Sequence, residues 1–243
     1  KYLQICKDYA FITMNSIILV ILLYCSLLYA QHINLFVQEK VVVLGNKYVK
    51  QNIILDAMNM DTKESIFSYD LDELHDNVES IEFVKSVKVS RILPSTLMIQ
   101  VMERSPIILV LLDDEKYFFD EEQTPLLASK EAINFFPVPI MTFANDDPLK
   151  LGDFELTKAL RFVNKSKTIH NELYVNLSEL RYKNNNLSLI TDGRTKIDLG
   201  DNEALYKISI LKEFQNIVKE KRSLNDYAYI NLKIGNQIIV REH

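Results

Sequence analysis

Residues 84–106 read VKSVKVSRILPSTLMIQVMERSP and contain the same short pattern twice. Apolar and polar residues alternate at 87–90. At 97–102 the positions Leu97, Ile99 and Val101 alternate with Met98, Gln100 and Met102. A period of two is typical of a strand with one buried face. Leu93-Pro94-Ser95 lies between the two patterns. The stretch therefore predicts two strands joined by a tight connection.

The residues before this stretch predict one strand and two helices. Val41-Val42-Val43-Leu44 is a β-type run that ends at the turn residues Gly45-Asn46. Apolar residues at helical spacing follow it at Val49, Ile53, Ile54, Ala57 and Met60, and a second apolar stripe follows Asp70 at Leu71, Leu74, Val78 and Ile81. Asp70 is a good helix N-cap. The order β-α-α-β-β over residues 37–106 predicts one sheet covered by two helices.

Further upstream, residues 11–30 form a mostly apolar segment of about twenty residues, which as a helix would cross roughly 30 Å of hydrocarbon. A cleaved signal peptide is the alternative, but its apolar core would be shorter and Leu28 and Tyr29 would be small residues. We therefore predict a membrane-spanning helix at 11–30 after a cytoplasmic segment at 1–10. Lys1 and Lys7 precede the span, which favours an N-terminus in the cytoplasm and residues 31–243 on the exported side.

Composition excludes several classes of function. The chain has 28 Lys and Arg against 33 Asp and Glu, a net charge of -5, without a basic stripe, so nucleic acid is an unexpected partner. Five glycines and two cysteines leave little material for a disulfide framework, a CxxC metal pair or a glycine-rich phosphate loop. The four histidines share no ligand spacing, and Asp113-Asp114-Glu115 is interpreted as a hairpin turn. We predict no catalytic residue, metal, cofactor or small-molecule substrate.

Residues 107–243 predict a mostly β module. The β-type runs are 107–112, 117–120, 124–127, 138–143, 173–182, 186–191, 196–200 and two runs around Gly235-Asn236 within 227–240. A short helix is expected at 155–163. A longer helix, capped by Asp201 or Asn202, carries apolar residues at Leu205, Ile208, Leu211 and Val218 and is expected to pack on the sheet. The fold class is α+β.

The first module resembles a POTRA domain of the FtsQ/DivIB family. The matching string V-x-R-x-x-P-x-x-L-x-I-x-V-x-E-R-x-P runs from Val89 to Pro106, and Leu93 stands where the family usually has an aromatic residue. Arg91, Glu103 and Arg104 could form a functional charge cluster, but we interpret them as an ordinary cross-strand pair on a solvated face.

The second module resembles the β domain of the same family. Tyr229-Ile230-Asn231-Leu232-Lys233-Ile234 is similar to its closing Y-x-D-L-R-Y motif, with Asn231 for the aspartate, Lys233 for the arginine and Ile234 for the second aromatic residue. Phe143 occupies the place of a glycine that is usual in the family.

The resemblance implies a non-enzymatic scaffold of the bacterial divisome, anchored by one helix in the cytoplasmic (inner) membrane at the division septum. It implies FtsB-like and FtsL-like partners, together with other divisome members, and a link between early and late septation proteins. The last β run has an exposed edge with which a partner strand can pair. We predict that Tyr229, Asn231, Lys233 and Ile234 form this partner-binding edge, with plain sheet packing as the alternative.

Two other classes of protein stay open at this point. Another POTRA-bearing envelope assembly or secretion protein would append a long barrel, and no long run of amphipathic strands follows residue 106. An anchored cell-wall enzyme would need paired acids or a nucleophile beside a histidine, and the sequence contains no such arrangement.

Overall fold

The computed structural model of the chain describes residues 2–60, 64–112, 115–143, 154–183, 186–200, 204–234 and 237–243, with the backbone alone at 2–10 and 154–155. Contacts divide the protein into two units, Lys1–Glu103 and Arg104–His243. The sequence predicts a domain boundary after Pro106, three residues beyond the division at Glu103. Pro106 is the first residue of strand β4 (Pro106–Leu112) and belongs to the second unit.

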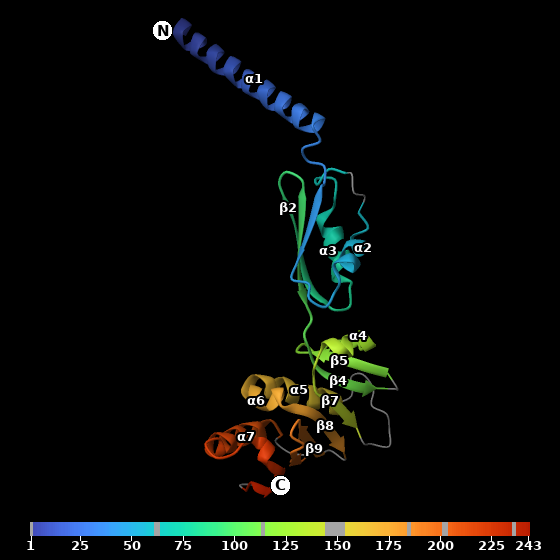
Figure 1. Ribbon diagram of the computed structural model, residues 1–243. Helices are drawn as coiled ribbons and strands as arrows, with labels where there is room; N and C mark the ends of the chain where they lie inside the picture. Colours follow the sequence, from blue (N-terminus) through green and yellow to red (C-terminus); the bar gives the residue numbers. More distant parts are fainter. Residues whose placement is uncertain are drawn as a thin grey trace. The chain divides into compact units, whose positions relative to one another are not determined.

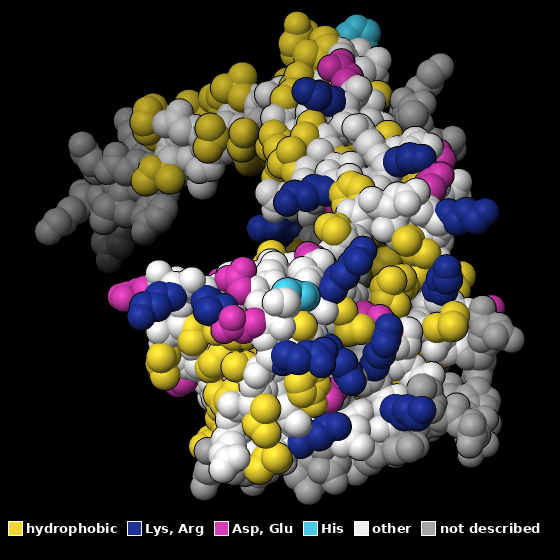
Figure 2. Space-filling view, turned by 60° about the horizontal axis from the view of Figure 1, so that its bottom comes forward, with side chains coloured by type: hydrophobic (Ala, Val, Ile, Leu, Met, Phe, Trp, Pro, Cys, Tyr) yellow, Lys and Arg dark blue, Asp and Glu magenta, His cyan; other side chains and the backbone are white. Residues whose placement is uncertain are grey.

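Helix α1 (Tyr2–His32) contains the predicted membrane span. Its segment Phe11–His32 has a mean hydropathy of 2.3, so by length and composition α1 can cross a membrane. Figure 2 shows hydrophobic side chains along this helix and no charged ones among its coloured residues. Helix α1 ends at His32, two residues beyond the C-terminal end of the predicted span 11–30.

The POTRA-type domain has the predicted element order. Its elements are β1 (Lys40–Leu44), α2 (Gln51–Met58), α3 (Leu71–Glu79), β2 (Val84–Ile92) and β3 (Thr96–Glu103). The sheet order is β1-β3-β2, with β1 parallel and β2 antiparallel to β3, and the helices cover one face (Figure 1). Asp70 caps α3 by accepting hydrogen bonds from the N–H groups of Asp72 and Glu73.

The alternation on β3 places its apolar residues in the core. Leu97 and Ile99 are fully buried and Val101 is nearly so, whereas Gln100 and Met102 are exposed. The buried row packs with Ile54 and Met58 of α2 and with Leu74 and Val78 of α3 as the core of this domain. Strand register and helix stripes thus agree with the pattern in the sequence.

Arg91, Glu103 and Arg104 do not pair with one another across the strands, so the interpretation as an ordinary surface pair is wrong. The Arg91 guanidinium donates hydrogen bonds to the carbonyl oxygens of Ile66 and Tyr69, both at 2.7 Å. Each charge in the motif instead binds a different part of the fold. The Glu103 carboxylate accepts hydrogen bonds from the backbone N–H groups of residues 47–49, and the Arg104 guanidinium donates to the Asp120 side chain.

The turn after β1 requires a glycine at position 45. Its φ is +88°, and a Cβ added there would lie 2.1 Å from the carbonyl oxygen of Val101. Any other L-residue would meet both backbone strain and a collision with β3.

The second unit is built on one large sheet. Its elements are β4, β5 (Glu115–Asp120), β6 (Pro125–Leu127), α4 (Lys130–Phe135), β7 (Ile140–Phe143), α5 (Phe154–Ile169), α6 (Asn171–Val175), β8 (Leu177–Lys183), β9 (Asn186–Thr191), β10 (Lys196–Gly200), α7 (Ala204–Val218), a short 3-10 turn at Leu224–Asp226, β11 (Tyr227–Asn231) and β12 (Ile239–Glu242). The strand order is β12-β11-β10-β9-β8-β7-β4-β5-β6. Buried side chains of α5, α6 and α7 form one core with the sheet.

Three helices differ from the sequence prediction. Helix α5 ends at Ile169 and not at residue 163. Leu173 to Val175 belongs to α6 rather than to a strand, because α6 packs on α5 and the Tyr174 hydroxyl donates a hydrogen bond to the Ile107 carbonyl oxygen at 3.0 Å. Helix α4 was not predicted, since six residues are too short to give a helical period; Ser129 caps it. The predicted cap at 201–202, the turn at 235–236 and Asp113-Asp114 lie outside the described residues.

Candidate functional site

The C-terminal strand β12 is the free edge of the large sheet, but the four predicted edge residues are not on it. Strand β11 pairs with β10 on one side and with β12 on the other. Tyr229 and Asn231 are therefore in an internal strand, and Lys233 and Ile234 follow its end. The prediction that Tyr229 and Asn231 lie on the edge strand is wrong, because the last run, 239–242, pairs with β11. The prediction that the four residues bind a partner stays a prediction.

The two edges of the sheet differ in their capacity to pair. All four residues of β12 are exposed. The opposite edge strand, β6, has three residues and begins with Pro125, which has no backbone N–H to donate. Of the two described edges, β12 therefore offers the longer row of main-chain groups to an incoming strand.

Behind the edge, β10 and β11 share a polar cluster centred on the buried carboxylate of Asp198. The Tyr229 hydroxyl donates a hydrogen bond to Asp198 Oδ2 at 2.9 Å. Lys233 Nζ lies 3.6 Å from the same oxygen, and Lys196 Nζ lies 3.4 Å from Oδ1. Lys233 therefore has an acidic counterpart within the chain itself.

This cluster holds Tyr229 and Lys233, two of the four residues that the sequence singled out. Burial raises the pKa of Tyr229, and the hydrogen bond to Asp198 raises it further, so the hydroxyl keeps the proton that it donates. Asn231 Oδ1 accepts a hydrogen bond from the backbone N–H of Lys233 at 2.8 Å and holds the chain where β11 ends. Ile234 is exposed and available for an apolar contact.

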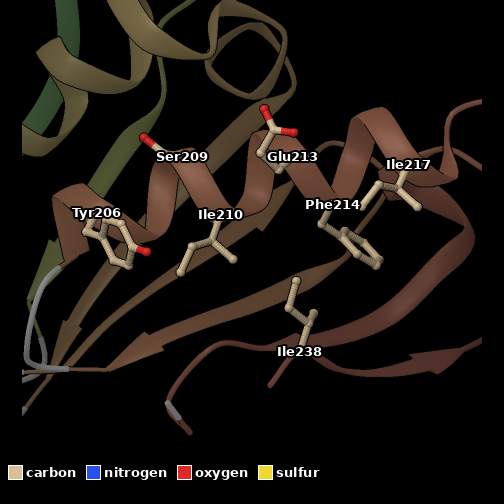
Figure 3. A pocket seen from close by; sticks show the side chains of 7 residues that line it. All are labelled: Tyr206, Ser209, Ile210, Glu213, Phe214, Ile217 and Ile238. Atoms are coloured by element: carbon tan, nitrogen blue, oxygen red, sulfur yellow. The ribbon is translucent and has the colours of Figure 1, made fainter. Parts of the chain in front are cut away.

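An apolar groove of about 420 Å³ lies between α7 and the segment that leads into β12. Its lining residues are Tyr206, Ser209, Ile210, Glu213, Phe214, Ile217 and Ile238. In Figure 3 the side chains of Ile210 and Phe214 point toward Ile238, whereas the Glu213 carboxylate points away from it. Tyr206 and Ile217 are exposed at the two ends of the row.

Charge around the edge is mainly positive, although the whole chain is negative. Lys196, Lys233 and Arg241 lie on the sheet face that carries Tyr229, because Lys196 and Arg241 are the register partners of Tyr229. Asp198 is the acid that faces Lys196 and Lys233 in the cluster. Glu242 is bound to Arg222 at 2.9 Å. Among the described residues on this face of the sheet, the cations therefore outnumber the acids.

Sequence reasoning missed Asp198, α7 and β12 as parts of one surface. Asp198 lies within a short apolar run, and its burial and its lysine partners depend on pairing between strands about thirty residues apart. Among the described residues, no three His, Cys, Asp or Glu side chains are grouped closely enough to hold a metal ion.

Comparisons with known proteins agree with this architecture. Residues 36–104 match the family model "POTRA domain, FtsQ-type", and residues 105–240 match "FtsQ/DivIB, C-terminal related". The cell division protein FtsQ of Rickettsia bellii is 37% identical over 87 residues, which are 36% of this chain and 33% of that protein. FtsQ of Mycobacterium tuberculosis is 29% identical over 84 residues, or 35% and 27% of the two chains.

The aligned segments span about a third of the length of the first of these curated relatives. The two family models together extend from the start of the POTRA-type domain to β12, and the second alone matches more than half of the chain. The chain therefore belongs to the FtsQ/DivIB family of bacterial cell division proteins.

Proposed function

We propose that this chain is a non-enzymatic, single-pass membrane scaffold of the divisome that binds FtsB-like and FtsL-like partners and links early and late septation proteins. The observation that carries the proposal is the free edge of β12, which lies beside the groove of α7. An extended segment that adds to β12 gains main-chain hydrogen bonds without displacing any native pairing.

Side chains on the two faces of β12 would set the specificity of such a segment. Ile239 and Arg241 pair with Asn231 and Tyr229, so they lie on the face of the Asp198 cluster. Val240 pairs with Ile230, which is fully buried in the core on the other face. The partner segment would carry an acidic residue toward Arg241 and apolar residues toward Val240.

The groove extends this surface beyond the strand. Ile238 immediately precedes β12 and lines the groove together with Ile210 and Phe214. A partner whose extended segment adjoins an apolar turn or helix would fill the groove while its strand pairs with β12. In this proposal, Tyr229, Asn231 and Lys233 act from behind the edge by holding the Asp198 cluster, and Ile234 makes an apolar contact.

The proposed orientation places the partner site on the exported side of the cytoplasmic membrane at the septum. Lys1 and Lys7 precede the apolar segment Phe11–His32, and the next Lys or Arg, Lys40, lies eight positions after its end. The bias of positive charge toward the N-terminal side supports a cytoplasmic N-terminus. Protease treatment of intact spheroplasts should digest residues after 33; digestion only after lysis would contradict this orientation.

Two matched proline variants test the edge. Neighbouring residues of an antiparallel edge strand alternate, so one N–H points to β11 and the next points outward. Ile239 and Val240 are similarly exposed, at 43% and 39%. One of the two variants Ile239→Pro and Val240→Pro removes the outward N–H, and we expect it to weaken partner binding by about 1 kcal/mol or more with little change in the free energy of unfolding. The other removes an N–H that bonds to β11, and we expect it to lower the free energy of unfolding.

The measurement is calorimetric titration of the full chain, in lipid nanodiscs, with the exported segment of an FtsB-like protein, together with thermal unfolding of each variant. Unchanged affinity in both variants would mean that the partner docks elsewhere. Assay of the same preparation on peptidoglycan tests the proposed lack of enzymatic activity, and release of soluble fragments would contradict it.

A further inference from the structure

Exposed apolar side chains gather at the end of the POTRA-type sheet where the chain enters from α1. Phe67 is exposed, and its ring lies 5.3 Å from that of Phe36 in an edge-to-face arrangement. Ile92 and Leu93, at the turn between β2 and β3, are exposed as well. We refer to Phe36, Phe67, Ile92 and Leu93 as the hairpin-end patch.

Hydrogen bonds hold the members of this patch at one end of the domain. The Ile66 N–H donates to the Phe36 carbonyl oxygen at 2.8 Å, and the Glu39 N–H donates to the Ser95 carbonyl oxygen at 3.0 Å. Arg91 links the two sides, since its Nε donates to the Ile66 carbonyl oxygen and its guanidinium lies 5.9 Å from the centre of the Phe67 ring. The turn between β2 and β3 therefore lies beside the residues that enter the domain (Figure 1).

The chain between this patch and α1 is short and has a defined turn. Asn34 has a φ of 52°, the Asn34 N–H donates to Gln31, and the Leu35 N–H donates to Ala30. These two bonds form a Schellman motif that ends the helix. From His32 to Phe36 there are four residue steps, which can span at most about 14 Å. Phe36 must therefore remain close to the surface of any bilayer that α1 crosses.

The charges near the patch favour an apolar contact over an electrostatic one. Lys40 and Arg91 are balanced in formal charge by Glu39 and Glu64, and the Arg91 guanidinium is already bound to backbone carbonyls. Aromatic and aliphatic side chains with neutral surroundings partition into the boundary between lipid headgroups and acyl chains. The tether provides an effective concentration on the order of millimolar, so even weak partitioning suffices.

We propose that the hairpin-end patch inserts into the exported leaflet of the same bilayer that α1 spans, with Leu93 at the point of deepest contact. The occupant of this surface is thus lipid, and zwitterionic lipid is sufficient. Such a contact would give the POTRA-type domain a second attachment to the membrane besides the covalent one. This inference depends on α1 as the anchor and goes beyond the scaffold function.

The absence of tryptophan from the sequence allows a direct test in the full chain. Leu93→Trp places one fluorophore in the patch, and Met102→Trp is its matched control, because Leu93 is 62% and Met102 is 59% exposed and Met102 lies at the other end of β3. Leu19→Trp in α1 is the positive control. Each variant is reconstituted at low density in phosphatidylcholine vesicles with brominated acyl chains.

We expect bromine to quench the tryptophan at 93 several-fold more than that at 102, with a blue-shifted emission and less quenching by acrylamide. Ile92→Trp should repeat this result, and Phe67→Ser in the Leu93→Trp background should reduce the quenching by lipid. Addition of anionic phosphatidylglycerol should leave it unchanged.

Equal quenching at 93 and 102, with strong quenching at 19, would overturn the membrane contact while leaving the anchor intact. Absence of quenching at 19 would instead contradict the anchor itself. A blue shift at 93 that increases with protein density and is insensitive to bromine would assign the patch to a second copy of the chain, and would also overturn the proposal.

Discussion

Glu103 and Arg104 are consecutive residues, yet their side chains are bound to different units of the protein. The Glu103 carboxylate accepts hydrogen bonds from the backbone N–H groups of Lys47, Tyr48 and Val49 at 2.8 to 3.1 Å. The Arg104 guanidinium donates to Asp120 Oδ2 at 2.8 Å. The Glu103 side chain is therefore bound within the first unit, by the loop before α2, and the Arg104 side chain within the second, at the end of β5.

Replacement of Glu103 by Gln tests the first of these attachments. Three converging N–H groups form a small anion-binding concavity, and an amide would offer them a neutral oxygen and an N–H₂ group in place of the second oxygen. We expect a loss of about 1 to 3 kcal/mol in the free energy of unfolding of the POTRA-type domain. Denaturant unfolding measures it. Met102→Gln, at an exposed neighbour, should unfold like the parent; equal stability of Glu103→Gln would contradict the role of the carboxylate.

The buried row of β3 gives a second prediction. Leu97 is fully buried, so Leu97→Asp places an unpaired carboxyl group in the core of the POTRA-type domain and should cost several kcal/mol. Met102→Asp, on an exposed position of the same strand, should change the midpoint of thermal unfolding little. A Leu97→Asp protein that melts like the parent would mean that the register of β3 is shifted by one residue.

Lys233→Glu separates a structural role of Lys233 from a role in binding. The Lys233 ammonium lies 3.6 Å from the buried Asp198 carboxylate, so a glutamate there removes an ion pair and adds repulsion. Because Lys233 is partly exposed, we expect a modest loss of stability of about 1 kcal/mol, in addition to weaker partner binding. Thermal unfolding and calorimetric titration of Lys233→Met, which removes only the attraction, should show a smaller effect on both. An unaltered melting temperature in Lys233→Glu would contradict the coupling to Asp198.

We predict that the free energy of unfolding of the second unit falls on acidification because of His170. Burial lowers the pKa of His170 from 6.5, and the neighbouring Lys212 lowers it further against the opposing effect of Glu172. The unfolded chain therefore binds a proton at a higher pH than the folded chain, and the free energy of unfolding decreases as the pH falls below about 6.5.

Unfolding of the full chain between pH 7.5 and 5.5, a range that brackets the usual histidine pKa of about 6.5, measures this decrease. We expect His170→Gln to reduce the slope, whereas His75→Gln, at a partly exposed side chain of the first unit, should retain it. An identical slope in the parent and in His170→Gln would mean that other groups cause the decrease.

The local patterns of the sequence determined the elements of the POTRA-type domain and the long apolar helix α1. Alternation at 97–102 places one face of β3 in the core, and the uncharged stretch that includes residues 11–30 forms one long helix. Such patterns are informative because burial of one face, or of a whole helix surface, depends on residues a few positions apart. The presence of a closing pair of strands in the second unit followed from the same kind of pattern.

Only the tertiary structure decided which residues of the second unit meet at its edge. The closing motif lies on and just after β11, which pairs with β12. Tyr229 and Lys233 face Asp198, which belongs to a strand about thirty residues earlier in the chain. The sequence gives no register between distant strands, because main-chain pairing is nearly independent of side chains and the partner of each strand depends on the packing of the whole sheet. For the same reason, the sequence does not show that the side chains of the adjacent residues Glu103 and Arg104 bind different loops. Their partners follow only from the tertiary structure.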